Sequence, residues 1–178
     1  MDLMKGIRER RSVRKFTADL VEESHIQTLL EAVRWAPSWA NTQVWEVIVI
    51  RDEEVKKRLS LLLERNPAQK AMVAAPVVMA LAAKRGSSGY YKDKVTTDKG
   101  DWFMFDLGIA CQSLCLAAHD QGLGTVVAGM FDHDKAAEVV GLPQGYEVAV
   151  MIPLGYPAKP ASAPKRRPVD EFTHWEKF

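Results

Sequence analysis

Five cations and one hydroxyl crowd the segment RERRSVRK, from Arg8 to Lys15. Arg10, Arg11 and Arg14, with the Ser12 hydroxyl between them, supply several charge-assisted donors to one phosphate, because guanidinium forks match phosphate oxygens. A solvated basic face is the ordinary explanation of a short basic run. Both interpretations stay open on these residues alone.

A polar loop interrupts the stretch WAPSWANTQVWEVIVI, where a helical pattern breaks at Pro37 and a strand pattern follows. Short donors and acceptors stand there beside two indoles; they are Ser38, Asn41, Thr42 and Gln43, with Trp39 and Trp45. Amides and hydroxyls next to flat apolar groups suit a planar heterocycle with polar edges. The alternative is a plain helix-to-strand connection whose polar residues bond only their own backbone.

The composition is that of a globular protein, with 178 residues, 47% hydrophobic, 26% charged and a formal net charge of +1. We therefore expect one domain spanning residues 1–178. A balanced charge gives little non-specific attraction to nucleic acid. No apolar run approaches the roughly 18 residues of a membrane span, and no apolar leader opens the chain, so we expect a cytoplasmic protein without a membrane partner. Cys111 and Cys115 lack histidines at ligand spacing, so we predict core thiols and no metal site.

Hydrophobic periodicity predicts the elements that must position these groups. An amphipathic helix is expected over residues 22–36 and a strand over 46–50, followed by a helix that Asp52 caps and that continues to the break at Asn66 and Pro67. The continuous apolar run PVVMALAA, 76–83, predicts an interior strand covered on both faces.

The stretch from Asp101 to Gln121 predicts the longest helix, apolar on nearly every side and therefore buried all round. One helix rarely finds enough cover in a chain of this size, so we expect part of it to meet a second copy, with Leu114 at or near that packing surface. The preceding segment, 85–100, is polar and carries Tyr90 and Tyr91. Its length favours a functional loop, such as a lid that selects substrate.

Residues 122–130, GLGTVVAGM, predict a short strand. They fail the dinucleotide fingerprint because Val127 stands where the third glycine belongs. A small helix is expected over 132–140, with an Asp N-cap and Gly141 after its end, and then a strand over 146–152. Four prolines make residues 157–178 an extended arm. Within it Lys165, Arg166 and Arg167 form a second basic cluster, which either converges on the same anion as the first or is a surface charge run.

Five motifs, in order, resemble the FMN-dependent nitroreductase family; they are RRSVRKF, APSWANTQVW, GLGTVVAGMF, PLGYP and KRRPVDEFTHW. The resemblance covers nearly the whole chain. It implies an α+β fold in which helices flank a mixed β-sheet, with a long central helix at a dimer interface and an extended C-terminal arm. It also implies an obligate homodimer with one FMN in each of two interface sites.

Residue by residue, the resemblance carries over the family's flavin contacts. Arg10, Arg11, Ser12 and Arg14 match the phosphate and ribityl positions, and Arg166 and Arg167 match the terminal basic pair. The loop that the partner subunit lays on the isoalloxazine matches Pro37, Ser38, Trp39 and Asn41. Gly129 and Met130 match the backbone amides near flavin N5. For the pyrimidine edge the candidates are Asn66, Gln69 and Lys70, at loose spacing. Val44 departs from the proline that the family often has there.

The implied activity is reduction of nitroaromatic, quinone or related acceptors by NAD(P)H through FMN in a ping-pong cycle. The flavin carries the chemistry, so no side chain is expected to act as a catalytic acid or base. A flavin-binding protein without turnover, which stores or processes FMN, is the alternative. The choice between NADH and NADPH, the physiological acceptor, and one- or two-electron transfer are not determined by these residues.

Overall fold

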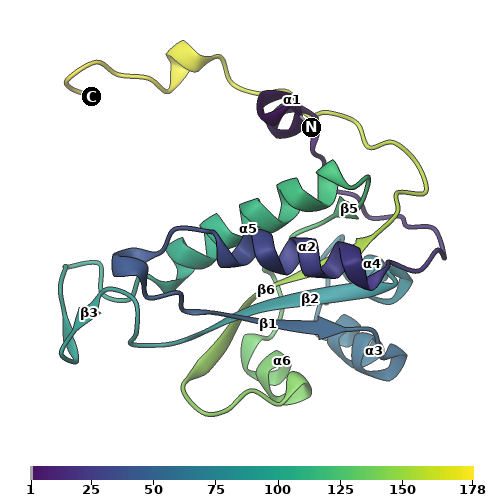
Figure 1. Cartoon of the computed structure of the whole chain (residues 1–178), viewed down its shortest axis with the longest axis horizontal. Helices are drawn as coiled ribbons and strands as arrows, with labels where there is room; N and C mark the ends of the chain where they lie inside the picture. Colours follow the sequence, from purple (N-terminus) through teal and green to yellow (C-terminus); the bar gives the residue numbers. More distant parts are fainter. Residues whose placement is uncertain (1) are drawn as a thin grey trace.

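The computed structural model describes residues 2–178 and shows one four-stranded sheet with helices on both faces (Figure 1). The strand order is β1-β2-β6-β5. The helices are α1 (Leu3–Glu9), α2 (Glu23–Arg34), α3 (Glu53–Leu61), α4 (Gln69–Ala74), α5 (Phe103–Asp120) and α6 (His133–Val140), with 3₁₀ turns η1 (Trp39–Asn41) and η2 (Val169–Glu171). The strands are β1 (Trp45–Ile50), β2 (Val77–Lys84), β5 (Gly124–Thr125) and β6 (Tyr146–Gly155), and β3 (Tyr90–Tyr91) pairs with β4 (Lys94–Val95) as a separate ribbon.

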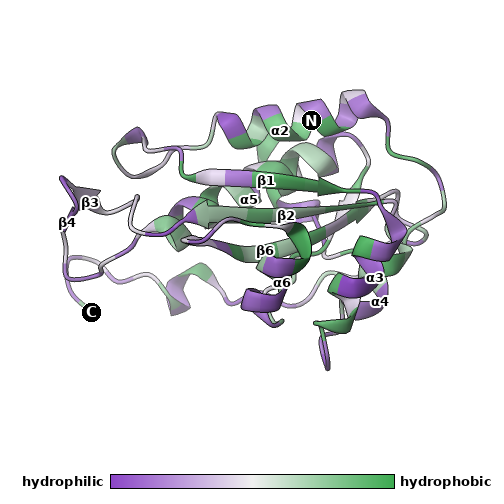
Figure 2. Cartoon of the chain, turned by 90° about the horizontal axis from the view of Figure 1, so that it is seen from below, coloured by the Kyte–Doolittle hydropathy of each residue, from purple (hydrophilic) through white to green (hydrophobic). Residues whose placement is uncertain are grey.

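The strand β2 is the centre of the core, as the run PVVMALAA predicted. Its side chains alternate between two apolar clusters, because successive residues of a strand point to opposite faces. Met79 and Leu81 pack with α2 and α5, whereas Val78 and Ala80 pack with α3, α4 and α6. The hydropathy colouring shows a mostly green sheet between α2 and α5 on one side and α3 and α6 on the other, with purple residues on α2, α3 and α6 (Figure 2).

We expected a mixed sheet, but all three strand pairings in this sheet are antiparallel. The reason is the connection between the two strands. Helices α3 and α4 return the chain to the end of the sheet at which β1 finishes, so β2 starts opposite Ile50 and runs antiparallel to β1. Within residues 2–178 the only parallel pairing is an isolated bridge between Ser12 and Thr125.

Local capping agrees with the sequence. Asp2, Asp52 and Asp132 each accept a hydrogen bond from a backbone N–H in the first turn of α1, α3 and α6, at 2.8, 2.8 and 3.1 Å. Gly141 ends α6 in the left-handed conformation, with φ 71°. The third helix stops at Leu61, earlier than predicted, and the unpredicted α4 follows the turns around Asn66.

Helix α5 spans the predicted stretch but is not buried all round within one chain. Leu107, Leu114 and Ala118 are fully or almost fully buried, whereas Met104 and Phe105 are 53% and 61% exposed. Leu114 therefore lies in the core of the subunit, and our expectation that it borders a second copy is wrong. The prediction failed because an almost uniformly apolar helix does not reveal which side its own sheet covers.

The segment 122–130 holds less strand than expected, because only β5 pairs with β6 and Ala128 adds a single bridge to Met151. Residues 157–178 contain only the 3₁₀ turn η2 as regular structure and are exposed apart from Thr173. No helix within residues 2–178 is long and apolar enough to cross a membrane. In the same range no three His, Cys, Asp or Glu side chains are grouped to hold a metal ion.

Candidate flavin site

Two anchors fix the backbone of the N-terminal basic segment. The amide of Val13 donates to the carbonyl of Thr125 at 2.8 Å, and Ser12 forms the parallel bridge to the same residue. Gly124 permits this approach, because a Cβ there would lie 2.7 Å from the Cβ of Val13. Since Val13 points into the core, its neighbours Ser12 and Arg14 point to solvent, where a ligand can reach them.

A cavity of about 480 Å³ opens on this segment and is basic on both sides. Ser12, Arg14 and Lys15 line one wall, and Lys159 lies on the other, in the C-terminal arm. The arm is held there because the amide of Ala158 donates to the carbonyl of Lys15 at 2.9 Å. Sequence reasoning missed Lys159; its signal was a lysine next to the prolines that start the arm.

The other two predicted arginines of this segment face adjoining cavities. Arg10 and Arg11 line one of about 310 Å³, beside His119 at the end of α5. Both also line a further cavity of about 260 Å³, where Arg166 joins them. The structure thus brings one of the two arm arginines to the N-terminal cluster.

Arg167 is engaged elsewhere in the arm. Its guanidinium donates to the carboxylate and the backbone carbonyl of Glu171 and lies 5.9 Å from the ring centroid of Phe172. Its expected role at a phosphate stays a prediction, and it requires these contacts to break.

The polar residues of the loop after Pro37 bond largely to one another. The Ser38 hydroxyl accepts from the Gln43 amide at 2.9 Å, and the Asn41 side-chain oxygen accepts from the Gln43 side chain at 3.2 Å. Ala40, Asn41 and Gln43 have φ of 44°, 57° and 50°, a conformation that side-chain-bearing residues adopt at a cost. The loop is therefore held in one shape, and a ligand would meet its backbone and Trp39 as much as its polar side chains.

Gly129 and Met130 lie in the exposed turn between β5 and α6. No hydrogen bond within residues 2–178 uses either of their N–H groups, which leaves both donors available to a ligand. The Met130 carbonyl accepts from the Asn66 side chain at 3.1 Å. Of the three pyrimidine-edge candidates, Asn66 is thus beside this turn. The Gln69 side chain instead donates to the Ser60 carbonyl at 3.2 Å, which ties α4 to α3.

The Trp39 loop and the N-terminal basic segment lie at two ends of one helix. The amide of Trp39 bonds to Asp106 in the first turn of α5, whereas Arg10 lies beside His119 in its last turn. Thirteen residues separate Asp106 from His119, or about 20 Å along a helix. In Figure 1 the loop containing η1 and the helix α1 likewise stand at opposite ends of α5. A single chain therefore does not bring the Trp39 loop to the basic cavity.

Two buried thiols lie on α5 between these ends. Cys111 and Cys115 are 9% and 2% exposed and free, as predicted for core residues. The hydrogen bond with Cys115 and burial both raise the pKa of the Cys111 thiol, which keeps it protonated at neutral pH.

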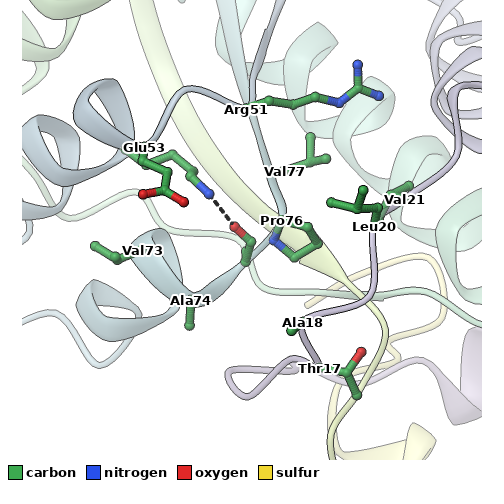
Figure 3. A pocket seen from close by; sticks show the side chains of 12 residues that line it. Thr17, Ala18, Leu20, Val21, Arg51, Glu53, Val73, Ala74, Pro76 and Val77 are labelled. Carbon is green, nitrogen blue, oxygen red and sulfur yellow. Dashed lines mark hydrogen bonds between the residues drawn. The ribbon is translucent and has the colours of Figure 1, made fainter.

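A further cavity, of about 440 Å³, contains none of the predicted residues (Figure 3). Leu20, Val21 and Pro76 line it together with Arg51. The buried ammonium of Lys56 donates to the Ala75 carbonyl at 2.8 Å, at the end of α4. This bond satisfies a helix-terminal carbonyl, so Lys56 has a structural role there.

Comparison with known proteins identifies the family of this chain. The family model described as the nitroreductase family matches residues 7–67 and 61–156, so the chain belongs to that family. A putative NADH dehydrogenase/NAD(P)H nitroreductase of Methanothermobacter thermautotrophicus is 31% identical over 89% of this chain and 79% of its own. The FMN reductase [NAD(P)H] of Bacillus subtilis is 27% identical over 99% of this chain and 74% of its own.

Solved structures show the same fold. A putative NADH dehydrogenase/NAD(P)H nitroreductase from Bacteroides thetaiotaomicron superposes with a TM-score of 0.81 at 26% identity, over 98% of this chain and 97% of the other. A nitroreductase family protein from Clostridium difficile 630 superposes with a TM-score of 0.86 at 23% identity, over the whole of both chains. The α+β fold, with a sheet between helices, is thus that of the nitroreductases.

Proposed function

We propose that this protein is an FMN-dependent oxidoreductase that uses NAD(P)H to reduce nitroaromatic, quinone or related acceptors. The observation that carries the proposal is the basic cavity shared by Ser12, Arg14 and Lys159, in a chain of the nitroreductase family. Relatives named NAD(P)H nitroreductase and FMN reductase support the reaction class and the cofactor. Residues 1–178 would form one FMN-binding domain.

The donor set fits a flavin mononucleotide. Guanidinium and ammonium groups around a surface cavity match a phosphate dianion, and Arg10, Arg11, Ser12, Arg14 and Arg166 would hold it, with Lys159 added from the structure. The unused N–H groups of Gly129 and Met130 would face the edge of the isoalloxazine that carries N5, and Asn66 or Gln69 its pyrimidine edge. Bound FMN would supply hydride acceptance from NAD(P)H and electron donation to the acceptor in two half-reactions.

The protein's own contribution is placement and charge. Cations near the phosphate would fix the position of the cofactor, while preorganised backbone N–H groups would stabilise negative charge that develops on the ring. A phosphate site, backbone N–H donors and an aromatic loop would therefore be enough for the protein's part in the reaction. None of them requires a side chain that exchanges protons.

We further propose that the site is completed by a second chain. In one chain the Trp39 loop is bonded to Asp106, whereas the cavity of Arg10 and Arg11 lies beside His119, about 20 Å further along α5. The exposed apolar side chains of Met104 and Phe105 and the uncovered arm offer a surface for a second copy. In an antiparallel pair of α5 helices, the Trp39 loop of each chain would reach the basic cavity of its partner. Pro37, Ser38, Trp39 and Asn41 would then cover the partner's flavin.

The test is to purify the protein, record its visible spectrum, identify the flavin released on denaturation, and assay NADH and NADPH against a panel of acceptors. We expect a yellow dimer with one FMN per chain and acceptor-dependent oxidation of at least one nicotinamide. A preparation that stays colourless after FMN is added would overturn the proposal. Stoichiometric FMN without turnover on any acceptor would favour flavin storage or processing instead.

A further inference from the structure

Asp106 is a buried carboxylate that the flavin site as described does not use. Its side chain is 0% exposed, and within residues 2–178 it forms no ion pair. One carboxylate oxygen accepts from the Trp39 amide at 2.9 Å and the other accepts from the Ser88 hydroxyl at 2.6 Å. A buried charge is costly unless it is hydrogen-bonded, and the first turn of a helix favours a negative group. The two donors therefore have to stay in place.

On one side, this carboxylate holds the base of the 85–100 loop. The Ser88 carbonyl accepts from the Trp102 amide at 3.0 Å, and the Trp102 indole donates to Thr97 at 2.9 Å. Gly89, with φ +84°, is packed so closely that a Cβ would lie 2.4 Å from Trp102 and 2.5 Å from the Gly100 carbonyl. The loop that carries Tyr90 and Tyr91 is thus clamped to the start of α5 at Ser88.

On the other side, the same carboxylate holds the main chain of the 37–43 loop. The donor is the Trp39 backbone amide, so the bond fixes the path of the chain rather than one side chain. It acts directly before Ala40 and Asn41, whose positive φ values need support from their surroundings. Within residues 2–178, Asp106 is therefore the one side chain with hydrogen bonds to both loops.

We propose that Asp106 is a positioning residue that holds the 37–43 and 85–100 loops in one fixed relation. Through it, the loop that recognises the acceptor and the loop that covers the partner's flavin are aligned with each other. The inference rests on the proposed function, because the roles of both loops come from it. Loss of the carboxylate should loosen both loops, whereas loss of the Ser88 hydroxyl should loosen only the 85–100 loop.

The first experiment needs no cofactor or substrate. Hydrogen exchange of the purified full chain would be compared among wild type, Asp106→Ala, Asp106→Asn and Ser88→Ala. The control is Ser113→Ala, on the same helix, whose hydroxyl bonds only the Ile109 carbonyl at 3.2 Å. We expect faster exchange in both loops for Asp106→Ala, in 85–100 alone for Ser88→Ala, and in neither for the control. Asp106→Asn keeps an acceptor for Trp39 and should fall between wild type and Asp106→Ala.

The second experiment separates positioning from mere stability. In the flavin-loaded enzyme, Ser88→Ala should raise the KM for the acceptor roughly fivefold to tenfold, the size of one net hydrogen bond, without changing flavin affinity. Asp106→Ala should raise both the acceptor KM and the flavin Kd, and Asp106→Asn should raise both by a smaller factor. Variants that melt earlier but keep wild-type loop exchange, KM and flavin Kd would overturn the proposal. If Asp106→Ala does not fold, Asp106→Asn and Ser88→Ala decide the outcome. A wild type without flavin or turnover would refute the proposed function instead, while the exchange pattern would still test Asp106.

Discussion

The C-terminal end of α5 gathers cations that have few partners inside the chain, whereas its N-terminal end holds polar groups that bond mainly to one another. Within residues 2–178 no ion pair involves Arg10, Arg14 or Lys15. Ser38, Asn41 and Asp106 all have hydrogen-bond partners in the protein. One end is therefore arranged to attract a charged ligand, and the other to present a fixed surface.

In the proposed dimer, this contrast would allow one helix to serve two sites. A phosphate binds well to cations that have no ion-pair partner in the protein, since their N–H donors can form charge-assisted hydrogen bonds to it. A flat ring needs a rigid wall, and internal bonds provide that rigidity before the ligand arrives. In the proposed dimer each flavin would meet the cationic end of one α5 and the rigid end of the other.

The largest expected effect comes from placing a charge on either of two faces of α5. Leu114→Glu should unfold the subunit, because an unpaired polar group in the core costs on the order of 2–7 kcal/mol even when it is neutral, and a charge costs more. Gly108→Glu should leave the subunit folded, because Gly108 is exposed and a Cβ there meets nothing within 4 Å. It should nevertheless abolish the dimer and flavin binding together. Circular dichroism, light scattering and flavin absorbance on one chromatographic peak would report both outcomes. A folded Gly108→Glu monomer with stoichiometric FMN would show that one chain builds the site.

The next effect concerns the cationic end. Arg14→Ala should weaken FMN binding by about 1.5–3 kcal/mol, the value of a hydrogen bond to a charged group. Added salt should reduce the difference in FMN affinity between Arg14→Ala and wild type, because Arg14 is exposed and salt screens exposed charges. Fluorescence titration of FMN would measure it, with Arg58→Ala, an exposed cation on α3, as the control. Equal FMN dissociation constants for Arg14→Ala and wild type would mean that the basic segment is only a solvated surface.

A smaller effect is expected at the rigid end. Replacing Tyr90 and Tyr91 by Ala should change kcat/KM among acceptors by about 0.5–1.5 kcal/mol, the scale of an aromatic contact. Flavin content should stay at the wild-type level, because both residues lie in the β3–β4 ribbon, away from the basic cavities. Steady-state kinetics with several quinones and nitroaromatics would measure the change. If the double variant has the same acceptor preference as wild type, the 85–100 segment is only a connection between β2 and α5.

The smallest effect separates two neighbouring arginines of the arm. Arg166→Ala should weaken FMN binding more than Arg167→Ala, because Arg166 lines a cavity with Arg10 while Arg167 is bound to Glu171. The difference should be about 1 kcal/mol or less, as for exposed charged groups. Parallel FMN titrations at low salt would resolve it. The opposite ranking would mean that the arm rearranges when FMN binds.

Much of the fold was predictable because its signals are local. Asp52 and Asp132 cap helices through bonds that span three residues, and the run around Met79 is apolar throughout because both faces of β2 are covered. The length of α5 followed from its composition. The pairing direction did not, since it depends on where α3 and α4 return the chain, and no single segment records that path.

The candidate site divides in the same way. The types and spacing of Arg10, Arg11, Ser12 and Arg14 allowed a phosphate site as one of two interpretations, because donors that suit a phosphate lie within five residues. The contribution of Lys159, the engagement of Arg167 and the role of Asp106 needed the structure, since each depends on segments that are distant along the chain.

The sequence by itself determined α2, α5 and α6, the central strand, the basic segment and the family resemblance, because periodicity, capping and short motifs act over a few residues. Only the tertiary structure decided that Leu114 faces the core, that the sheet is antiparallel, and that the Trp39 loop and the basic segment stand at opposite ends of α5. Those facts depend on which elements, far apart in the chain, pack against one another and bury each other's apolar surface. The pattern of residues along the chain does not specify those contacts.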